Sequence, residues 1–536
     1  MTVTSHVDTF ARDRLPPAAQ WPEMVFALPF LQYPERFNIA HVLLHEAIRQ
    51  GHGPRPAILS QGVCWTYAAL LDQAGRIARV LRDDLALVPG NRVLLRGANT
   101  PMMAASVLAV WLAGGIVVPT MPMLRSPELA TVLERAQVSL ALCAVDLAAE
   151  MALARSGASS LKRVVLFDEA TLLGHEATLA QDGGFDAVDT AADDVCLIAF
   201  TSGTTGKPKG TMHFHRDLLA AADCFPRAML QPTARDIFTG TPPLAFTFGL
   251  GAMLLFPLRY GAATALIARP TPEVLLQAIA DFKATICATA PTFYRQMTPL
   301  ADRQRLASLR HAVSAGEPLP VATREAWERA TGVQMTDGIG STEMLHIFIS
   351  ANGTEIRPGA TGKAVPGYSA CVLDDTGRAL PPNTVGRLAV KGPTGCRYLD
   401  DARQRDYVQG GWNVTGDAYE MDDDGYFWYR ARIDDMIVSS GYNIAGPEVE
   451  AVLLQHPAVA ECAVVGWPDE ERGQIVKAYI VARNLPDTGP ALVRDLQDFV
   501  KQAIAPYKYP RAIEFRTALP RTETGKLQRY KLRAGA

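Results

Sequence analysis

Residues 201–210 read Thr-Ser-Gly-Thr-Thr-Gly-Lys-Pro-Lys-Gly, and this stretch decides how the rest of the chain is interpreted. Its glycines allow the backbone to approach an anion with the N–H groups turned inward. Its hydroxyl side chains donate further hydrogen bonds, and its two lysines supply positive charge. The apolar run 195–200 is typical of a buried strand, and 210–213 looks extended. The sequence therefore predicts a polyphosphate-binding loop that joins two strands.

This loop differs from a Walker A loop, which has four residues between its glycines and a hydroxyl residue after its lysine. Here only two residues separate Gly203 from Gly206, and Pro208 follows Lys207. A flexible Gly/Thr linker is the alternative, but linkers rarely follow a buried strand. The decapeptide resembles the phosphate-loop signature of the adenylate-forming enzymes, which include acyl- and aryl-CoA ligases, peptide-synthetase adenylation domains and luciferases. The resemblance extends over about residues 37–533.

The bulk properties are those of a multidomain globular protein. A chain of 536 residues exceeds what one hydrophobic core usually supports, so at least two domains are expected. The formal charge of −3 gives no general attraction to nucleic acid or to an anionic membrane. The eight cysteines are scattered without a C-x-x-C pair, which predicts buried free thiols in a reducing cytosol. The first residues lack the pattern of a signal peptide, so a cytoplasmic protein is expected, either a monomer or a homodimer.

The uncharged stretch 102–124 is long enough to span a bilayer. The pair Gly114-Gly115 interrupts it, and Pro119 and Pro122 follow. A buried helix, a turn and a short strand fit this pattern better than a membrane span.

Strand-like and helix-like segments alternate through most of the first 350 residues, the α/β layered pattern. A β-rich texture follows at 353–429, and the chain after Arg432 reads as a compact α+β unit. The resemblance implies the adenylate-forming fold: a large N-terminal α/β domain (1–432) with a β-rich subdomain, and a small mobile C-terminal domain (433–536). It makes Asp434 the hinge. The expected strands are 140–145, 164–167, 262–268, 369–373, 386–391, 425–429, 460–465 and 474–481, and the expected helices are 273–282, 321–330, 447–455 and 491–503.

Residues 337–344 read Asp-Gly-Ile-Gly-Ser-Thr-Glu-Met, which suits a ligand that the backbone must approach; a plain strand end and turn is the alternative. The segment resembles the second core motif of the family. That resemblance implies that Thr342 contacts the α-phosphate and that Glu343 holds Mg²⁺, a cation that prefers one or two carboxylates plus substrate phosphates.

Residues 413–417 read Asn-Val-Thr-Gly-Asp, and a carboxylate after a glycine turn can accept hydrogen bonds from both ribose hydroxyls. The resemblance assigns this role to Asp417 and adds Arg432 as a ribose contact. The family usually has glycine before this arginine, whereas this chain has Ala431.

Residues 521–533 contain five basic residues and one glutamate, a pattern also typical of a solvated tail. The stretch Pro-Arg-Thr-Glu-Thr-Gly-Lys resembles the last core motif, which makes Lys526 the catalytic lysine. Its ammonium would neutralise charge that builds up when a carboxylate attacks a phosphate.

The resemblance also implies the contacts of each substrate. The ATP contacts are Thr201, Ser202, Gly203, Thr204, Thr205, Gly206, Lys207, Gly316, Glu317, Pro318, Asp337, Gly338, Ile339, Gly340, Ser341, Thr342, Asp417, Tyr429, Arg432 and Lys526. The acid contacts are Phe246, Thr247, Phe248, Ala315, Gly316, Gly338, His346 and Ile347, and the coenzyme A contacts are Ser440, Gly441 and Tyr442. ATP, Mg²⁺ and coenzyme A are thus the expected ligands, with no tightly bound prosthetic group.

Within the family, 337–348 resembles the benzoate-type aryl-CoA ligases, and the overall texture resembles the 2-aminobenzoate-CoA ligases. Aromatic side chains at 245–251 favour a planar ring, and His346 could hydrogen-bond an ortho substituent. Phe248 stands where benzoate ligases commonly have tyrosine, and Thr247 where they commonly have alanine, so unsubstituted benzoate is not the expected best substrate. Residues 440–450 and 505–511 also resemble medium-chain acyl-CoA ligases, so a medium-chain acid remains an alternative substrate.

Two other functions stay open: a stand-alone adenylation enzyme that loads a carrier protein, and a non-catalytic nucleotide sensor. The presence of both Glu343 and Lys526 disfavours the sensor. There is no G-x-S-x-G, H-E-x-x-H or G-x-G-x-x-G, which disfavours a serine hydrolase, a zincin and a Rossmann dehydrogenase. His213 and His215 are expected to alternate on a strand in a structural role.

Overall fold

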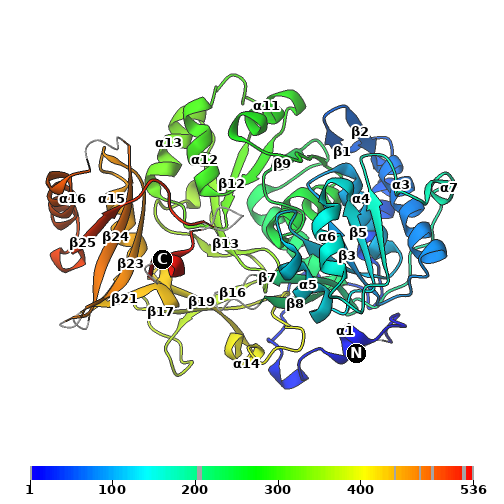
Figure 1. Cartoon of the computed structure of the whole chain (residues 1–536), viewed down its shortest axis with the longest axis horizontal. Coiled ribbons are helices and arrows are strands. Elements are labelled where there is room, and N and C mark those ends of the chain that lie inside the picture. The colour runs from blue at the N-terminus through cyan, green and yellow to red at the C-terminus, as the bar shows by residue number, and fades with distance from the viewer. Residues whose placement is uncertain are drawn as a thin grey trace.

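The computed structural model describes residues 3–201, 208–439, 442–469, 472–483, 488–521 and 527–533. Two α/β sheets form the larger part of the molecule, and a smaller unit containing the C-terminus lies at one end (Figure 1). This is the mixed α/β arrangement that the sequence predicts.

The first sheet has six strands in the order β6-β5-β3-β4-β7-β8. All its neighbours are parallel except β7 and β8, which pair antiparallel. The strands are β3 (Arg92–Arg96), β4 (Ile116–Thr120), β5 (Leu140–Ala144), β6 (Arg163–Phe167), β7 (Val195–Thr201) and β8 (Lys209–Phe214). As predicted, the phosphate loop begins at the end of one strand, β7, and ends at the start of another, β8.

The second sheet has nine strands in the order β15-β14-β13-β12-β11-β9-β10-β1-β2. The strands are β1 (Pro56–Ser60), β2 (Val63–Thr66), β9 (Ile237–Gly240), β10 (Ala263–Ala265), β11 (Ile286–Thr289), β12 (His311–Ala315), β13 (Met335–Gly340), β14 (Ile347–Ser350) and β15 (Lys363–Ala364). The expected strand 262–268 is thus shorter than predicted. The expected helices 273–282 and 321–330 are confirmed as α11 (Pro272–Phe282) and α13 (Val321–Thr331).

Helix α4 (Pro101–Leu112) confirms the buried-helix interpretation of 102–124. Thr100 caps it by accepting a hydrogen bond from the backbone of Met103, and every residue from Met102 to Leu112 is buried. A turn with Gly114 at φ 72° leads directly into β4. No helix among the described residues is long and apolar enough to cross a membrane.

The largest apolar core joins both sheets. Side chains of α2 (Ile39–Ala47), α4 and α8 (His215–Phe225) belong to the same buried cluster as residues of β3 and β11. The remaining helices of this part of the chain are α1 (Phe10–Asp13), α3 (Tyr67–Arg79), α5 (Ser126–Arg135), α6 (Ala148–Arg155), α7 (Glu176–Leu179), α9 (Thr247–Leu250), α10 (Phe256–Arg259) and α12 (Pro291–Met297). Shared burial of this kind makes the two sheets one rigid scaffold.

A five-stranded antiparallel sheet follows the second α/β sheet, as the β-rich texture predicts. Its strands are β16 (Ser369–Leu373), β17 (Val385–Lys391), β18 (Val408–Gln409), β19 (Trp412–Met421) and β20 (Phe427–Arg432), and the short helix α14 (Gln404–Tyr407) precedes β18.

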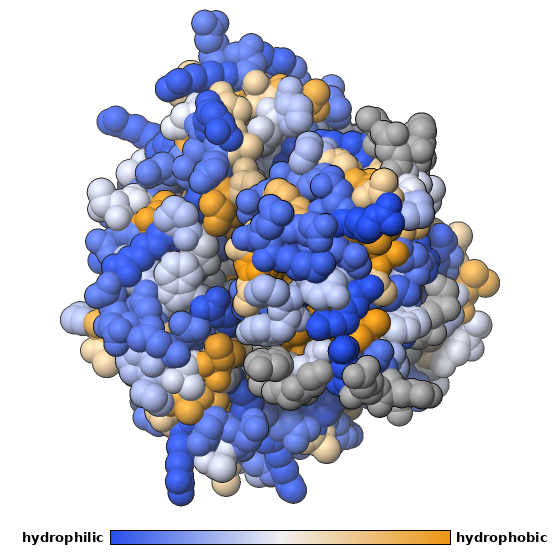
Figure 2. Space-filling view, turned by 90° about the vertical axis from the view of Figure 1, so that its left-hand side faces the viewer, coloured by the Kyte–Doolittle hydropathy of each residue, from blue (hydrophilic) through white to orange (hydrophobic). Residues whose placement is uncertain are grey.

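The C-terminal unit begins after β20 with the turn Ile433–Asp435 and the hairpin β21 (Met436–Ser439) and β22 (Tyr442–Ala445). Strands β23 (Val459–Asp469), β24 (Gly473–Ala482) and β25 (Ala512–Phe515) form its sheet, in line with the expected strands. Helices α15 (Gly446–Leu453) and α16 (Pro490–Ala503) share the core of this unit, while α17 (Arg529–Arg533) packs through Leu532 in a separate small cluster. The end of the molecule that carries this unit is mostly hydrophilic, with scattered apolar side chains (Figure 2).

Two smaller expectations are wrong. His215 is the first residue of α8 and does not lie on the strand with His213, because β8 ends at Phe214. Cys64 is exposed and Cys371 half-buried, whereas the other six cysteines are buried thiols as predicted.

Candidate functional site

The ends of the predicted phosphate loop are held by the β7–β8 hairpin. Thr201 pairs across the ladder with Lys209. The Thr201 hydroxyl is buried and has no hydrogen-bond partner among the described residues, the condition of a donor that a ligand would satisfy. The predicted loop residues Ser202, Gly203, Thr204, Thr205, Gly206 and Lys207 lie outside the described residues.

The second motif forms the end of β13 and the turn into β14. Gly338 and Gly340 are required by packing, because a Cβ would lie 2.6 Å from Ile347 and 2.7 Å from the carbonyl oxygen of His346, respectively. Leu345 adopts the left-handed conformation with φ 68°, which is unfavourable for a bulky residue. Within a few residues, this turn thus carries Ser341 and Glu343, which contact tyrosine hydroxyls, and His346, which contacts phenylalanine rings.

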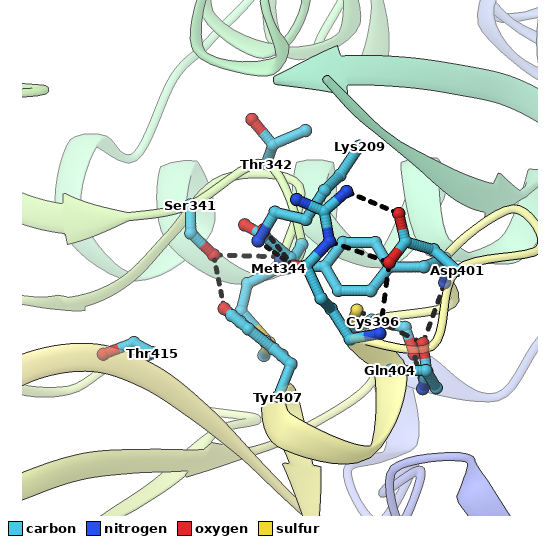
Figure 3. A network of polar contacts seen from close by, with 12 residues as sticks. Lys209, Ser341, Thr342, Met344, Cys396, Asp401, Gln404, Tyr407 and Thr415 are labelled. Atoms are coloured by element: carbon cyan, nitrogen blue, oxygen red, sulfur yellow. Dashed lines mark hydrogen bonds and ion pairs between the residues drawn. The ribbon is translucent and has the colours of Figure 1, made fainter. Parts of the chain in front are cut away.

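Glu343 lies in a network of polar side chains from distant segments. The Tyr398 hydroxyl donates to Glu343 Oε1 at 2.5 Å, and Lys209 Nζ donates to the same hydroxyl at 2.8 Å. Lys209, Ser341, Thr342 and Tyr407 gather around this turn in Figure 3. Burial, followed by the charge of Glu343, raises the pKa of Tyr398 far above its usual value, so the phenol keeps its proton.

A buried series of polar contacts supports the backbone at Thr342. His213 Nε2 lies 2.8 Å from the Thr342 carbonyl oxygen. The other ring nitrogen, Nδ1, lies 3.8 Å from the carboxylate oxygen Oδ2 of Asp217. Asp217 accepts a hydrogen bond from the buried Arg397 at 2.8 Å. Arg397 and neighbouring charges hold the pKa of Asp217 near 2 although burial acts in the opposite direction. These contacts fix the position of Thr342.

The predicted ribose contacts come together. Asp417 and Arg432 are cross-strand partners on β19 and β20, and Arg432 Nη1 lies 3.1 Å from Asp417 Oδ1. Gly416 has φ 78° and its missing Cβ leaves room for the guanidinium. Tyr429 is half-buried on β20. Helix α14, which carries Tyr407, packs against β19, so this pair lies on the same side of the fold as the turn at 341–343.

The segment 316–318, whose three residues are predicted ATP contacts, contacts the C-terminal unit. Gly316 has φ 91° directly after β12, which ends at Ala315, and Pro318 is exposed. Glu317 accepts a hydrogen bond from Thr292 at 2.7 Å and lies 3.9 Å from Arg521.

Arg521 joins the two parts of the chain. It also pairs with Glu461 of the C-terminal unit at 2.8 Å, and Glu461 lies 3.7 Å from Arg295 of the larger part. Arg521 is five residues before Lys526 in the sequence. Lys526 itself lies outside the described residues, so its predicted role stays a prediction.

An aromatic cage surrounds the predicted acid contact His346. The rings of Phe256, Phe225 and Phe248 lie 4.4, 5.5 and 5.5 Å from the imidazole, centroid to centroid. Gly251 is needed beneath the ring, because a Cβ there would lie 2.4 Å from it.

The imidazole of His346 is 3% exposed, and neither ring nitrogen has a partner with hydrogen-bond geometry among the described residues. Burial lowers its pKa to about 3, and a polar contact with the Phe248 backbone, whose geometry falls short of a hydrogen bond, opposes this only in part. The neutral imidazole therefore offers one hydrogen-bond donor and one acceptor in apolar surroundings.

The other predicted acid contacts lie in the same region of the sheet. Phe246 and Phe248 are half-buried around α9, where Thr247 is buried, and Ile347 begins β14. Asp337 and Gly338 on β13 pair with Ser314 and Ala315 on β12. Burial raises the pKa of Asp337 to about 7, and the Arg324 guanidinium opposes this shift.

The predicted hinge and coenzyme A residues are described only in part. Asp434 lies in the turn Ile433–Asp435 between β20 and β21, and Tyr442 begins β22; their backbones are described but their side chains are not. Ser440 and Gly441 lie outside the described residues. A surface depression elsewhere contains no predicted site residue; it is lined by Leu85, Arg155, Lys162, Arg163, Val164, Val165 and His175.

Sequence reasoning missed Tyr398, Tyr407 and the chain from His213 to Arg397. Lys209 was visible in the loop motif as a positive charge, but not as a partner of Glu343. No local pattern marks the tyrosines, because their hydroxyl groups contact residues more than 50 positions away.

Comparison with known proteins gives a consistent result. The family described as AMP-binding enzyme matches residues 44–397, and the AMP-binding enzyme C-terminal domain matches residues 448–526. A benzoate-CoA ligase of Thauera aromatica is 35% identical over 513 residues, which cover 94% of this chain and 97% of that protein. An uncharacterized acyl-CoA ligase, YtcI, of Bacillus subtilis is 34% identical and covers 88% of this chain and 90% of its own length.

Two solved structures share the whole architecture. The anthranilate CoA ligase AuaEII in complex with anthranoyl-AMP superposes with a TM-score of 0.89 at 33% identity, covering 95% of this chain and 99% of that one. A benzoate CoA ligase from Burkholderia xenovorans superposes with a TM-score of 0.85 at 32% identity, covering 93% and 100%.

Proposed function

Because the chain belongs to the AMP-binding enzyme family, we propose that it is an ATP-dependent, AMP-forming aryl-CoA ligase. The aromatic cage around His346 is the observation that carries the choice of an aryl acid. It lies at the end of the same turn that carries Thr342 and Glu343, so an acid that binds beside His346 would be close to the nucleotide. Rigid aromatic walls favour a flat ring over a flexible aliphatic tail.

In the first half-reaction, a carboxylate oxygen of the acid attacks the α-phosphorus of ATP, the bond to the bridging oxygen breaks, and pyrophosphate leaves. The Thr342 hydroxyl donates to the α-phosphate, and Asp417 accepts from the ribose hydroxyls. Lys526 neutralises the charge that builds up between the two anions. This contribution is largest in the transition state, where it lowers the barrier.

In the second half-reaction, the thiol of coenzyme A loses its proton to solvent, its sulfur attacks the acyl carbon, and AMP leaves with the electrons of the C–O bond. We propose that the C-terminal unit (433–536) turns about Asp434 between the two steps, so that residues 440–442 replace the Lys526 loop beside the acyl group. The ion pair of Arg521 with Glu317 joins the C-terminal unit to the larger part of the molecule, and Arg521 precedes Lys526 by five residues, which supports the proposed position of this unit in the first step.

A divalent cation such as Mg²⁺ fits the residues at the turn. Glu343 is buried and receives its hydrogen bond on Oε1, while no hydrogen bond from the described residues reaches Oε2. Mg²⁺ is commonly held in proteins by one or two carboxylates together with substrate phosphates, and Glu343 can supply such a carboxylate. Mg²⁺ held by Glu343 would neutralise phosphate charge.

His346 supports a more specific substrate. Its two unpartnered nitrogens match an acid with a polar group ortho to the carboxylate, and 2-aminobenzoate is the substrate that we propose. The adenylation step is tested by acid-dependent exchange of labelled pyrophosphate into ATP. The choice of acid is tested by kcat/KM for benzoate, the three aminobenzoates and hexanoate with coenzyme A. Preference for hexanoate would favour a medium-chain ligase, transfer only to a carrier protein would favour a loading enzyme, and no exchange with any acid would refute the proposal.

A further inference from the structure

One phenol hydroxyl separates the two charges beside the nucleotide site. Lys209 Nζ donates to the Tyr398 hydroxyl at 2.8 Å, and that hydroxyl donates to Glu343 Oε1 at 2.5 Å. The direct separation between Lys209 Nζ and Glu343 Oε1 is 3.7 Å, beyond hydrogen-bond distance. The lysine and the carboxylate are therefore neighbours that do not form a direct, hydrogen-bonded ion pair.

The segment that carries Tyr398 is anchored independently of any ligand. The backbone N–H of Tyr398 donates to Gln404 Oε1 at 2.8 Å, and Gln404 Nε2 donates to the backbone of Gln20 and Cys396. Asp401 accepts hydrogen bonds from the guanidinium groups of Arg403 and Arg135. Figure 3 shows Asp401 beside Gln404 in this network. Tyr398 is 1% exposed, so its ring has little freedom to move with Lys209 or with Glu343.

A second tyrosine of the same segment packs against the first. The Tyr407 ring meets that of Tyr398 edge to face at 5.8 Å, and its hydroxyl lies 3.2 Å from Ser341 Oγ. Lys209 Nζ lies 4.7 Å from the centre of the Tyr398 ring, which favours the ammonium near this face. The ammonium is thus held by the rings as well as by the hydroxyl.

Removal of the Tyr398 hydroxyl would leave Lys209 and Glu343 facing each other in a half-buried environment. A long lysine side chain can close the remaining gap and form the direct ion pair, since each would otherwise lack its strongest partner. That ion pair would occupy the carboxylate that the proposed function assigns to a cation.

We propose that Tyr398 is a positioning residue that keeps Lys209 away from Glu343, so that the carboxylate stays available to a divalent cation. The inference rests on the proposed function, because it concerns the cation that accompanies ATP. Tyr398 does not touch the substrate in this assignment; it acts through Glu343.

The test measures Mn²⁺ binding by electron paramagnetic resonance at saturating ATP and without acid. Tyr398→Phe is expected to raise the Mn²⁺ dissociation constant about tenfold, as for other residues that orient a metal ligand. The same substitution in a Lys209→Met background is expected to change it by less than about twofold, because no ammonium remains to capture Glu343. Equal losses in both backgrounds would show a merely structural role and would overturn the proposal.

Two controls keep the outcome interpretable. Tyr294→Phe deletes another buried hydroxyl, which donates to the carbonyls of Cys287 and Val313, and should leave Mn²⁺ affinity unchanged. If Tyr398→Phe does not fold, Lys209→Met decides at an ATP concentration shown to saturate this variant, because Lys209 also belongs to the predicted phosphate loop: unchanged or tighter Mn²⁺ binding then supports the proposal, and a tenfold loss refutes it. Wild-type protein that binds Mn²⁺ and ATP but exchanges no pyrophosphate with any aryl acid would refute the proposed function and leave this inference standing.

Discussion

Replacing His346 with leucine is expected to remove a preference for ortho-substituted aromatic acids. The imidazole is buried among Phe225, Phe248 and Phe256, and both nitrogens lack partners among the described residues. An ortho amino group that satisfies one nitrogen should gain about 1–3 kcal/mol, which corresponds to about 5- to 150-fold in kcat/KM over benzoate. Leucine has a similar volume and no polar atom, so benzoate itself should change by less than about threefold.

The assay is the ratio of kcat/KM for 2-aminobenzoate to that for benzoate, measured with coenzyme A and saturating ATP. His346→Leu should bring this ratio close to one. The ratio in the wild-type enzyme should not vary between pH 6 and 9, because burial lowers the pKa of His346 to about 3 and the ring is neutral throughout. A ratio that falls on acidification near pH 6.5 would mean that the ring titrates in the site.

His6→Leu is the matched control. His6 is also a buried histidine with two unpartnered nitrogens, but it lies in the N-terminal segment away from the site. Its replacement should leave the ratio unchanged. If His346→Leu keeps the wild-type ratio within twofold, His346 does not bind the ring substituent, and its proposed role in substrate preference is refuted.

Three further predictions follow from charges at the site and between the two parts of the chain. Lys526→Ala should abolish acyl-AMP formation and largely spare thioester formation from supplied acyl-AMP; equal loss of both half-reactions would contradict the two-state assignment. Arg521→Gln removes the ion pair with Glu317 across the two parts of the chain and should slow acyl-AMP formation by about two- to fivefold in single-turnover assays, while the thioester step from supplied acyl-AMP is unchanged. Burial raises the pKa of Asp337 to about 7, so the folded state holds this proton more tightly than the unfolded state and stability falls as pH rises from about 4 to about 7. The ionised carboxylate costs about 4 kcal/mol above that range, and Asp337→Asn should raise the melting temperature more at pH 8 than at pH 5; an equal rise at both pH values would refute the shift.

The sequence by itself predicts the elements whose signals are local. The apolar run before the phosphate loop predicts β7, and the glycine and proline breaks at 114–122 separate α4 from β4. The motifs at 337–344 and 413–417 carry their own glycines, whose conformations and close contacts the structure explains. Local patterns succeed here because strand periodicity, turn residues and close backbone approach each depend on neighbouring residues only.

Tertiary structure alone decided how those motifs are supported. Tyr398 meets Glu343 across 55 residues, and Arg397 reaches Asp217 across 180 residues. The cage around His346 combines three phenylalanines from separate helical segments, and Arg521 contacts Glu317 only because the C-terminal unit docks on the larger part. A buried hydrogen bond or ion pair is selected by the space that the packed core leaves, and many residues of the same type occur along the chain. The sequence thus predicts which groups carry out the chemistry, whereas the fold determines the partners that hold them, since burial and distance arise only when remote segments pack together.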